Sequence, residues 1–528
     1  MKMHLSVHVA FWMLLSALSG AYGGKVLVFP LDGSHWINMK VIIEKLHSRG
    51  HDVTVVRASN SWYVKEGSTY YTSITIQNDG GFDEKFFSPV VERMLEIRRR
   101  GDSFWNRFLI ELEIISKFGE MHEDMVKMIS RMFDDEALMR SIEEAKYDVI
   151  LTDPAAGAGV MFAYHFKIPL VFNVRWTVHG EGHFAIAPSP LSYIPVPGAE
   201  LTDKMTFFER VRNVLCYIFT LFQMAVVTAP RYNAFCHKYF GPDVDYFSLF
   251  QDADIWLMRN DFTFEFPRPT MPNVVYMGGF QCKPSKPLPK HLEDFVQSSG
   301  EHGVIIMSLG TLISKLPQDI NEDIAAAFAQ LPHKVIWRYA GPKLANLGNN
   351  TLLVDWMPQN DLLGHPKTKV FVAHGGTNGV QEAIYHGVPL LGLPLVFDQP
   401  DNLSRMRKKG TAVIVDIAEL DRTVFLEALK EVLYNPSYSE NMKTLSRLHR
   451  DQPMKPLDHA IFWIENVMRN GGAPHLRTQS FRMSWFTYHS VDVILTLLGA
   501  VLVILLIVFY VSRCLCLCIL FRKKVKRE

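Results

Sequence analysis

Short apolar runs alternate with segments of helical periodicity along most of the chain. "KVLVFP" (25–30) is the first such run and "DVTVV" (52–56) is the second. Between them, apolar residues from Met39 to Leu46 recur at i, i+3, i+4 and i+7, which places them on one face of a helix. Apolar runs without alternation are typical of parallel strands that are buried on both faces. The pattern therefore predicts a βαβ unit at this point.

The same alternation continues in two series. "YDVILTD" (147–153) and "IPLVFN" (168–173) extend the first series around a helix of small residues. A second series starts near Gly303 and consists of the runs "GVIIMSLGT", "HKVIWRYAG", "TLLVDWMPQ", "KVFVAHGG", "VPLLGLP" and "AVIVD". Each run is short and apolar, and helical stretches lie between the runs, which is the arrangement of a parallel sheet.

These patterns predict the fold class α/β, with two doubly wound Rossmann-like domains facing a cleft. The N-terminal domain is predicted over 24–281 and the C-terminal domain over 282–450, followed by helices and a membrane-proximal segment over 451–490. The proline-rich segment "CKPSKPLPK" (282–290) lacks periodicity and is interpreted as the linker. Ligands of doubly wound sheets bind at the carboxyl ends of the strands, so site residues are expected there.

Hydrophobic segments at both ends predict attachment to a membrane. Residues 1–23 combine Lys2, an apolar run and small residues at 19–21, which is the pattern of a secretory signal peptide. Residues 491–512 contain an uncharged stretch that is long enough to span a bilayer as a helix. Basic residues stay in the cytosol, so the tail (513–528) is predicted to be cytosolic and the body lumenal, as in a single-pass type I protein.

The tail ends in "KKVKRE", in which Lys524 and Lys526 have the spacing of a dilysine retrieval signal of the endoplasmic reticulum. A plain stop-transfer flank is the alternative interpretation. Three cysteines lie at the cytosolic boundary, where acylation is possible: Cys514, Cys516 and Cys518. Three more lie in the predicted lumenal part and allow at most one internal disulfide: Cys216, Cys236 and Cys282.

Two sequons for glycosylation occur in the predicted lumenal part. Asn349 opens the first, in a polar loop, and is the candidate for modification. Asn402 opens the second, which directly follows an Asp-Gln loop and is expected to be inaccessible.

Composition narrows the range of partners. The 528 residues carry 55 lysines and arginines against 54 aspartates and glutamates, which gives a net charge of +1. Neither a global field nor a long basic stripe is available to recruit nucleic acid. The expected partners are therefore small molecules and the membrane, and a homo- or hetero-oligomer is left open.

"HGGTNGVQEAIYHGVPLLGLPLVFDQ" (374–399) carries the clearest chemistry. His374 follows a strand, and Gly375 with Gly376 lets the backbone approach a ligand closely. Thr377 or Asn378 is expected to cap the helix that follows. The helix N-terminus offers unpaired N–H groups and partial positive charge, which suits a phosphate.

Other strand ends supply candidate partners for the rest of a nucleotide sugar. "SLGT" (308–311), with Ser308 and Gly310, is a second candidate phosphate loop. Trp356 offers an indole face for stacking on a base, and Gln359 follows at a turn. Glu382, one helical turn after Asn378, can accept ribose hydroxyls, and the Asp398-Gln399 pair can hold sugar hydroxyls. This part of the chain is therefore predicted to bind a nucleotide sugar.

Several of these segments resemble a known family. "FVAHGGTNGVQEAIYHGVPLLGLPLVFDQ" resembles the signature of UDP-glycosyltransferases. "MSLGT", "WMPQNDLLGHPKT", "DQPDN" and "FWIENVMR" resemble further motifs of vertebrate UDP-glucuronosyltransferases. The resemblance covers nearly the whole chain after the predicted signal peptide, including the spanning helix and the basic tail. It implies a GT-B type fold in which the C-terminal domain binds UDP-sugar and the N-terminal domain binds the acceptor.

The resemblance also implies roles for individual residues. Trp356 corresponds to the family's contact with uracil, and Gln359 and Glu382 correspond to its contacts with ribose. The contacts with the diphosphate fall on Ser308, His374, Asn378 and Gly379. The contacts with the sugar fall on Asp398 and Gln399. The sequence departs from the family at Val396-Phe397, where members usually carry Phe and then a small residue before Asp-Gln.

His35 and Asp153 are the candidate catalytic pair. Each lies at the end of a predicted strand of the N-terminal domain. Transfer to a hydroxyl needs a base, which histidine provides near neutral pH, and a carboxylate can orient its ring and stabilise the imidazolium. The resemblance implies that this pair is the family's catalytic dyad. The implied reaction is a single displacement in which an α-linked UDP-sugar gives a β-glycoside.

The favoured function is transfer of glucuronic acid from UDP-glucuronate to small lipophilic acceptors, with no further cofactor. Alternatives are the same chemistry with UDP-glucose, UDP-galactose or UDP-N-acetylglucosamine, a catalytically silent UDP-sugar-binding membrane partner, and a UDP-sugar epimerase. "DAD" (252–254) is a weak metal motif outside the donor half and is interpreted as structural, so no metal site is predicted. The apolar stretch "VLCYIFTLFQMAVV" (214–227) is interpreted mainly as core, with some residues near the acceptor or the bilayer.

Overall fold

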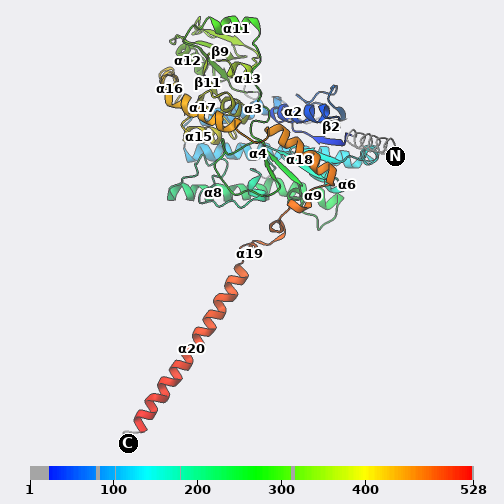
Figure 1. Ribbon diagram of the computed structural model, residues 1–528, viewed down its shortest axis with the longest axis vertical. Helices are drawn as coiled ribbons and strands as arrows, with labels where there is room; N and C mark the ends of the chain where they lie inside the picture. The colour runs from blue at the N-terminus through cyan, green and yellow to red at the C-terminus, as the bar shows by residue number, and fades with distance from the viewer. Residues whose placement is uncertain (1–22, 79–83, 102, 179, 311–315, 526–528) are drawn as a thin grey trace, which may run out of the picture. The chain divides into compact units, whose positions relative to one another are not determined.

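The computed structural model describes residues 23–525, apart from 79–83, 102, 179 and 311–315. The predicted signal peptide therefore lies almost wholly outside the described residues. The chain forms two compact units, one that ends at Leu476 and one that begins at Arg477. Both sheets belong to the first unit (Figure 1).

The first sheet has seven parallel strands in the order β3-β2-β1-β4-β5-β6-β7. Its strands are β1 (Lys25–Phe29), β2 (Asp52–Ala58), β3 (Thr72–Ile76), β4 (Val149–Thr152), β5 (Leu170–Val174), β6 (Ile255–Met258) and β7 (Val274–Tyr276). The strand order reverses between β1 and β4, which creates a crevice at their carboxyl ends. His35 and Asp153 follow these two strands.

Helices cover both faces of this sheet. They are α2 (Ser34–Ser48), α4 (Phe104–Asp134), α5 (Glu136–Ala145), α6 (Ala158–Phe166), α7 (His183–Ile186), α8 (Phe207–Gln223), a π-helix (Met224–Thr228), α9 (Ala229–Tyr239) and α10 (Tyr246–Gln251). Helix α3 (Glu84–Arg98) instead packs Val90, Val91, Met94 and Leu95 into the core of the second domain. The helix face predicted from Met39 to Leu46 lies fully buried in the core of the sheet. The βαβ prediction is therefore confirmed.

The second sheet has six parallel strands in the order β10-β9-β8-β11-β12-β13. They are β8 (Val304–Ser308), β9 (Lys334–Arg338), β10 (Thr351–Val354), β11 (Thr368–Ala373), β12 (Leu390–Gly392) and β13 (Ala412–Ile414). Each of the six apolar runs of the second series contains one of these strands. The surrounding helices are α11 (Lys290–Gln297), α12 (Gln318–Phe328), α13 (Gln359–Leu363), α14 (Thr377–His386), α15 (Gln399–Lys408), α16 (Arg422–Tyr434) and α17 (Pro436–Arg450).

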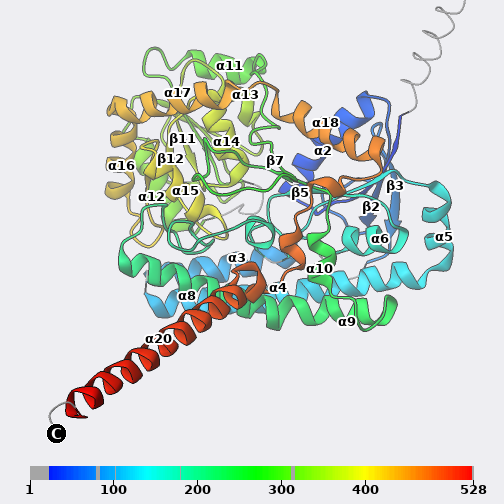
Figure 2. The ribbon, with the colours of Figure 1, turned by 60° about the horizontal axis from the view of Figure 1, so that its bottom comes forward.

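After the second sheet, the chain returns to the first. Helix α18 (Pro456–Asn470) packs beside α2 (Figure 2). Its residues Ile461, Ile464 and Val467 are fully buried in the same hydrophobic core as β1 and β4. A helix that follows the second sheet in sequence thus completes the core of the first. The domain boundaries at 281/282 and 450/451 stay predictions.

The second unit contains η3 (Gln479–Arg482), α19 (Trp485–Tyr488) and α20 (Val491–Val525). Residues 491–522 are long and apolar enough to cross a membrane, and none of that window is buried. A second helical stretch, Phe207–Tyr239, passes the same test of length and composition. It belongs to the first unit, where it is made of α8, the π-helix and α9.

The interpretation of the stretch 214–227 as mainly core is wrong. Leu215 is 60% exposed, Ile218 is 56% exposed and Phe222 is 56% exposed. Helix α8 continues through the π-helix into α9 along one edge of the first unit (Figure 2), and these three side chains lie on its solvent-exposed side. The buried Asn213 fixes this helix, because its side-chain amide donates to the Leu191 and Ile194 carbonyls.

Candidate active site

The carboxyl edges of the two sheets meet, and the candidate residues gather where they meet. The side-chain amides of Asn38 on α2 and Asn378 on α14 are 2.7 Å apart. Arg175, which follows β5, lies 3.2 Å from the Asp398 carboxylate at the start of α15. These contacts join the first sheet to the donor loops predicted on the second.

His35 and Asp153 are in direct contact. His35 Nδ1 lies 2.6 Å from Asp153 Oδ2, and Asp153 is fully buried. The other carboxylate oxygen accepts the backbone N–H of Ala155. A proton on Nδ1 is held by the carboxylate, so the neutral ring presents its lone pair on Nε2. This is the arrangement that a histidine base requires.

The loop before His35 is held by one carboxylate. Asp32 accepts the Ser61 hydroxyl and the backbone N–H groups of Trp62 and Tyr63. Gly33 follows with φ 68°, a left-handed conformation that glycine adopts without strain. Helix α2 then begins at Ser34, so His35 is presented from its first turn.

The two predicted phosphate loops lie against each other through His374. A Cβ atom on Gly310, which has φ 78°, would lie 2.6 Å from the His374 ring, and one on Gly376 would lie 2.5 Å from it. Both glycines are therefore required for this close approach. Arg338, at the end of β9, donates to the Gly310 carbonyl at 2.6 Å and fixes the first loop.

Burial lowers the pKa of His374 to about 4, and the positive charges of Arg175 and Arg338 act in the same direction. The ring is therefore neutral at physiological pH and can donate one N–H to an anion. Ser308, which is 3% exposed, lies at the end of the neighbouring strand β8.

The helix cap differs from the prediction. Helix α14 has Gly376 at its N-cap and no side-chain cap, so the assignment of this role to Thr377 or Asn378 is wrong. The Thr377 hydroxyl instead donates to Asp398, and the Asn378 amide meets Asn38. The backbone N–H groups in the first turn of α14 are therefore not capped by a side chain. Uncapped N–H groups at a helix N-terminus can bind an anion. Gly387 ends the helix in a left-handed conformation, as predicted.

The candidate base and ribose contacts lie on α13 and α14. Gln359 donates to Glu382 at 2.7 Å. Burial raises the pKa of Glu382 to about 7, although this hydrogen bond opposes the shift. Trp356, three residues before Gln359, is 71% exposed and presents an open indole face. Gly379 lies beside Gln359, because a Cβ there would be 3.5 Å from its side-chain nitrogen.

Asp398 and Gln399 differ in what they offer a sugar. Asp398 accepts from Arg175, Thr377 and Asn402. Burial opposes its ionisation, but these partners, led by Arg175, hold its pKa below the usual value. The Gln399 oxygen accepts the backbone N–H groups of Leu395 and Val396, and the residue is 5% exposed. The Gln399 amide oxygen thus stabilises the loop that directly precedes it.

Asn402 is 4% exposed, and its amide donates to Gly375 and Asp398. The second sequon is therefore buried, as expected. Asn349 lies at an exposed turn before β10. Asp254, in the weak metal motif, accepts the backbone N–H groups of Leu170 and Ala473 and thereby ties two segments of backbone together.

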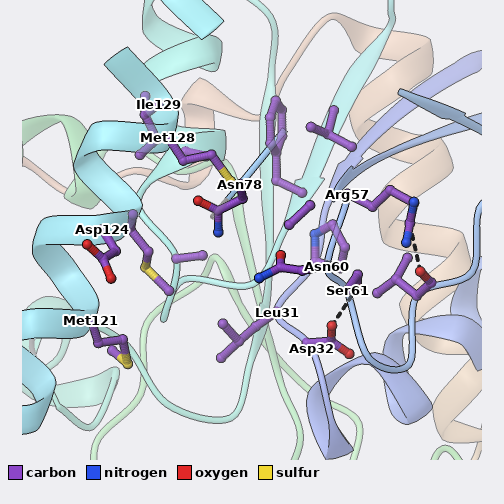
Figure 3. Close-up of a pocket in the computed structure, with 18 of the residues that line it drawn as sticks. Leu31, Asp32, Arg57, Asn60, Ser61, Asn78, Met121, Asp124, Met128 and Ile129 are labelled. Atoms are coloured by element: carbon purple, nitrogen blue, oxygen red, sulfur yellow. Dashed lines mark hydrogen bonds between the residues drawn. The ribbon is translucent and has the colours of Figure 1, made fainter. Parts of the chain in front are cut away.

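A pocket opens beside the loop that precedes His35. Figure 3 shows Met121, Asp124, Met128 and Ile129 reaching into it from α4. Asn60 and Ser61, after β2, face them across the pocket, and Leu31 and Asp32 form its floor near His35. The walls are mainly apolar with a few polar groups, which is the usual character of a small-molecule site.

Sequence reasoning missed the arginines of the site. Arg175, Arg259 and Arg338 each follow or end a strand of one of the two sheets. Their position at the carboxyl ends of strands could have predicted that they belong to the site, because Asp153 and His374 were selected by that position.

Solved glycosyltransferases share this arrangement of two sheets. The kitacinnamycin glycotransferase matches with a TM-score of 0.57 and 19% identity, over 84% of this chain and 99% of that one. The calicheamicin glycosyltransferase CalG4 matches with a TM-score of 0.54 and 16% identity, over 85% and 98%. At these identities the likeness establishes the fold. The protein has the GT-B fold, as predicted.

Sequence comparison identifies the family. The family model "UDP-glucoronosyl and UDP-glucosyl transferase" matches residues 24–528. UDP-glucuronosyltransferase 2B13 of Oryctolagus cuniculus is 44% identical over 511 residues, or 94% of each chain. UDP-glucuronosyltransferase 2B17 of Homo sapiens is 42% identical over 515 residues, or 95% of this chain and 94% of that one. The chain belongs to this family and is a glycosyltransferase that uses a UDP-sugar.

Gly310→Ala should weaken binding of UDP-sugar at least about tenfold, because the new Cβ collides with the His374 ring in a left-handed backbone. Titration calorimetry with UDP-glucose measures the effect. Gly300→Ala is the matched control, since Gly300 has φ 58° but open space around its Cβ. The control should keep its affinity, and unchanged affinity in Gly310→Ala would show that the contact does not shape the donor site.

UDP-glucose affinity should rise about fivefold between pH 6 and pH 8, because Glu382 ionises near pH 7 and a carboxylate accepts ribose hydroxyls more strongly than a carboxyl group does. His374 does not titrate in this range. The raised pKa of Glu382 has the opposite effect on folding, because the folded protein favours the protonated carboxyl group. The free energy of unfolding therefore falls as the pH rises from about 4.5 to 7. Glu382→Gln should abolish the pH dependence of binding, and its persistence would assign it to another group.

Proposed function

We propose that the enzyme transfers glucuronic acid from UDP-glucuronate to a hydroxyl of small lipophilic acceptors, with inversion at the anomeric carbon. The observation that carries this proposal is the contact of 2.6 Å between His35 and Asp153, beside an apolar pocket and opposite the donor loops. Relatives at 42–44% identity are named UDP-glucuronosyltransferases, which supports glucuronate as the sugar.

In this mechanism, His35 Nε2 removes the acceptor proton while the acceptor oxygen attacks the anomeric carbon. The bond between that carbon and the UDP oxygen breaks, and UDP leaves with the electron pair. The Asp153 carboxylate, hydrogen-bonded to Nδ1, stabilises the imidazolium that forms. The attack comes from the face opposite UDP, so an α-linked donor gives a β-glucuronide.

The donor occupies the second sheet in this proposal. Trp356 stacks on uracil, while Gln359 and Glu382 hold the ribose. His374, the N-terminus of α14 and the loop at Ser308 and Gly310 surround the diphosphate. Asn378 and Gly379 belong to the first turn of α14 and lie beside the same groups. The sugar lies against Asp398 and the Gln399 loop.

The acceptor occupies the pocket between α4 and the carboxyl ends of β1 and β2. The thioethers of Met121, Met125 and Met128 form much of its wall. Methionine side chains adapt to ligands of different shape, which suits a range of lipophilic acceptors. Leu31 also lines this pocket and lies four residues before His35, so the pocket adjoins the loop that leads to the proposed base.

We further propose that the enzyme resides in the membrane of the endoplasmic reticulum, with a lumenal catalytic unit and a short cytosolic tail. The apolar helix at 491–522 and the basic residues that follow it support this orientation. The sequon at Asn349, exposed at the surface, is consistent with glycosylation in that compartment.

His35→Ala should lower transfer to hydroxyl acceptors by about 10²–10⁴-fold and leave UDP binding close to normal. Asp153→Asn should lose most activity, and the double variant should be little worse than either single one, because the pair acts as a unit. Purified enzyme is incubated with UDP-glucuronate, UDP-glucose, UDP-galactose and UDP-N-acetylglucosamine and with phenols of graded pKa. Mass spectrometry identifies the products.

His47→Ala, at the exposed far end of α2, is the matched control and should keep full activity. The most acidic phenols should suffer least from His35→Ala, because their protons are already partly lost. Losses that multiply in the double variant would assign independent roles to His35 and Asp153. A product that carries a sugar other than glucuronic acid would contradict the proposed donor.

In sealed microsomes, added protease should remove only the tail after residue 512, and detergent should expose the rest. Asn349→Gln should remove a mass that endoglycosidase releases from the wild-type chain. Digestion of the catalytic unit without detergent would contradict the lumenal orientation.

A further inference from the structure

Two arginines emerge side by side from the first sheet into the site. Arg175 follows β5 and Arg259 follows β6, and these strands are paired with Val174 opposite Met258. The backbone N–H of Arg259 donates to the Val174 carbonyl at 3.0 Å. The two guanidinium groups therefore start from adjacent positions at the carboxyl edge that faces the donor loops.

Arg175 bridges the catalytic helix and the sugar loop. Its Nη2 lies 3.2 Å and 3.4 Å from the two Asp398 oxygens, and its Nη1 lies 3.5 Å from the Ser34 hydroxyl. Ser34 directly precedes His35, and its helix begins there. Arg175 is thus positioned between the base and the carboxylate that is expected to hold sugar hydroxyls.

Arg259 is buried more deeply and is less well compensated. It is 2% exposed, its Nη2 lies 3.3 Å from the Asn378 side-chain oxygen, and its Nη2 and Nε also face the Asn38 side-chain amide, whose oxygen can accept from them. Its Nη1 has no hydrogen-bond partner among the residues that the structure describes. Burial, together with the charge of Arg175, lowers its pKa to about 9, so it remains protonated at neutral pH. A buried donor on a cation is costly unless a partner arrives.

Two other buried arginines of the catalytic unit have their own carboxylates. Arg405 lies 2.9 Å from Glu265, and Arg268 lies 2.9 Å from Glu181. Around the cleft, Asp398 accepts from Arg175, and the charges of Asp153 and Asp398 both act on Arg259, but Arg259 has no carboxylate in hydrogen-bond contact among the described residues. Two carboxylates thus balance the two guanidinium charges, and Arg259 Nη1 keeps a donor that a ligand can use.

We propose that Arg175 and Arg259 form a subsite for the carboxylate of the donor sugar and thereby select a uronic acid over a neutral hexose. This inference rests on the proposed function. Sugar hydroxyls that donate to Asp398 would release Arg175, and the sugar carboxylate would then accept from Arg175 and from Arg259 Nη1. Guanidinium groups bind carboxylates through paired, charge-assisted hydrogen bonds, which a hydroxymethyl group cannot replace.

The test measures dissociation constants of the full-length enzyme in detergent for UDP-glucuronate, UDP-glucose and UDP. Arg259→Gln and Arg175→Gln should each weaken UDP-glucuronate about 10- to 100-fold, while UDP stays within about twofold. UDP-glucose should be unchanged or bind more tightly, since the variant lacks an unpaired buried charge. Arg259→Lys should fall between the wild type and Arg259→Gln, because it keeps the charge but loses the fork.

Arg268→Gln is the matched control: it removes another buried arginine of the same domain and should not alter the ratio of the two sugar nucleotides. Equal losses for UDP-glucuronate and UDP-glucose in the Arg175 and Arg259 variants, or no loss, would overturn the subsite. If the wild type still formed glucuronides, the proposed function would survive that result. A wild type that transfers only a neutral sugar would overturn both.

Discussion

The ion pair between Arg175 and Asp398 joins the two sheets at the centre of the site. Helix α15 extends this junction, because Asp401 accepts the backbone N–H groups of Gly198 and Glu200, and Arg405 pairs with Glu265. The three side chains, at 398, 401 and 405, lie about one helical turn apart and all reach the first domain. The proposed donor loop is thus fixed to the domain that carries His35, the proposed base, which is what a reaction between groups on two domains requires.

Burial then sets the charges inside this junction. It makes His374 neutral and brings Glu382 to the edge of ionisation, and it opposes the charge of Asp398, whose pKa is held low by Arg175, Asn402 and Thr377. The resulting site contains neutral and cationic donors, which suits a diphosphate and, under the inference above, a uronate. A long-range field from the net charge of +1 would be too weak to achieve this, so recognition depends on these local groups.

Much of the fold could be predicted from apolar runs, because parallel strands buried on both faces leave a strong signal. His35 and Asp153 could be selected because each follows such a strand. The partners of Asp398 could not be predicted, since Arg175 lies 223 positions away and meets it only through tertiary packing. Helix α8 was misjudged for a related reason: composition does not show whether an apolar helix faces the core or the outside.

Phe397 shows why the departure from the family pattern matters structurally. It precedes Asp398 with φ 57°, a left-handed conformation that costs a residue with a side chain roughly 1 kcal/mol or more. A small residue tolerates that geometry more readily, but the Phe397 ring packs edge-on to Phe118 of α4 at 6.3 Å. Phe118 in turn packs with Met121 and Met125, which line the proposed acceptor pocket. The ring therefore links the sugar loop to the acceptor wall, and the strain at position 397 persists because contacts from both domains hold it there.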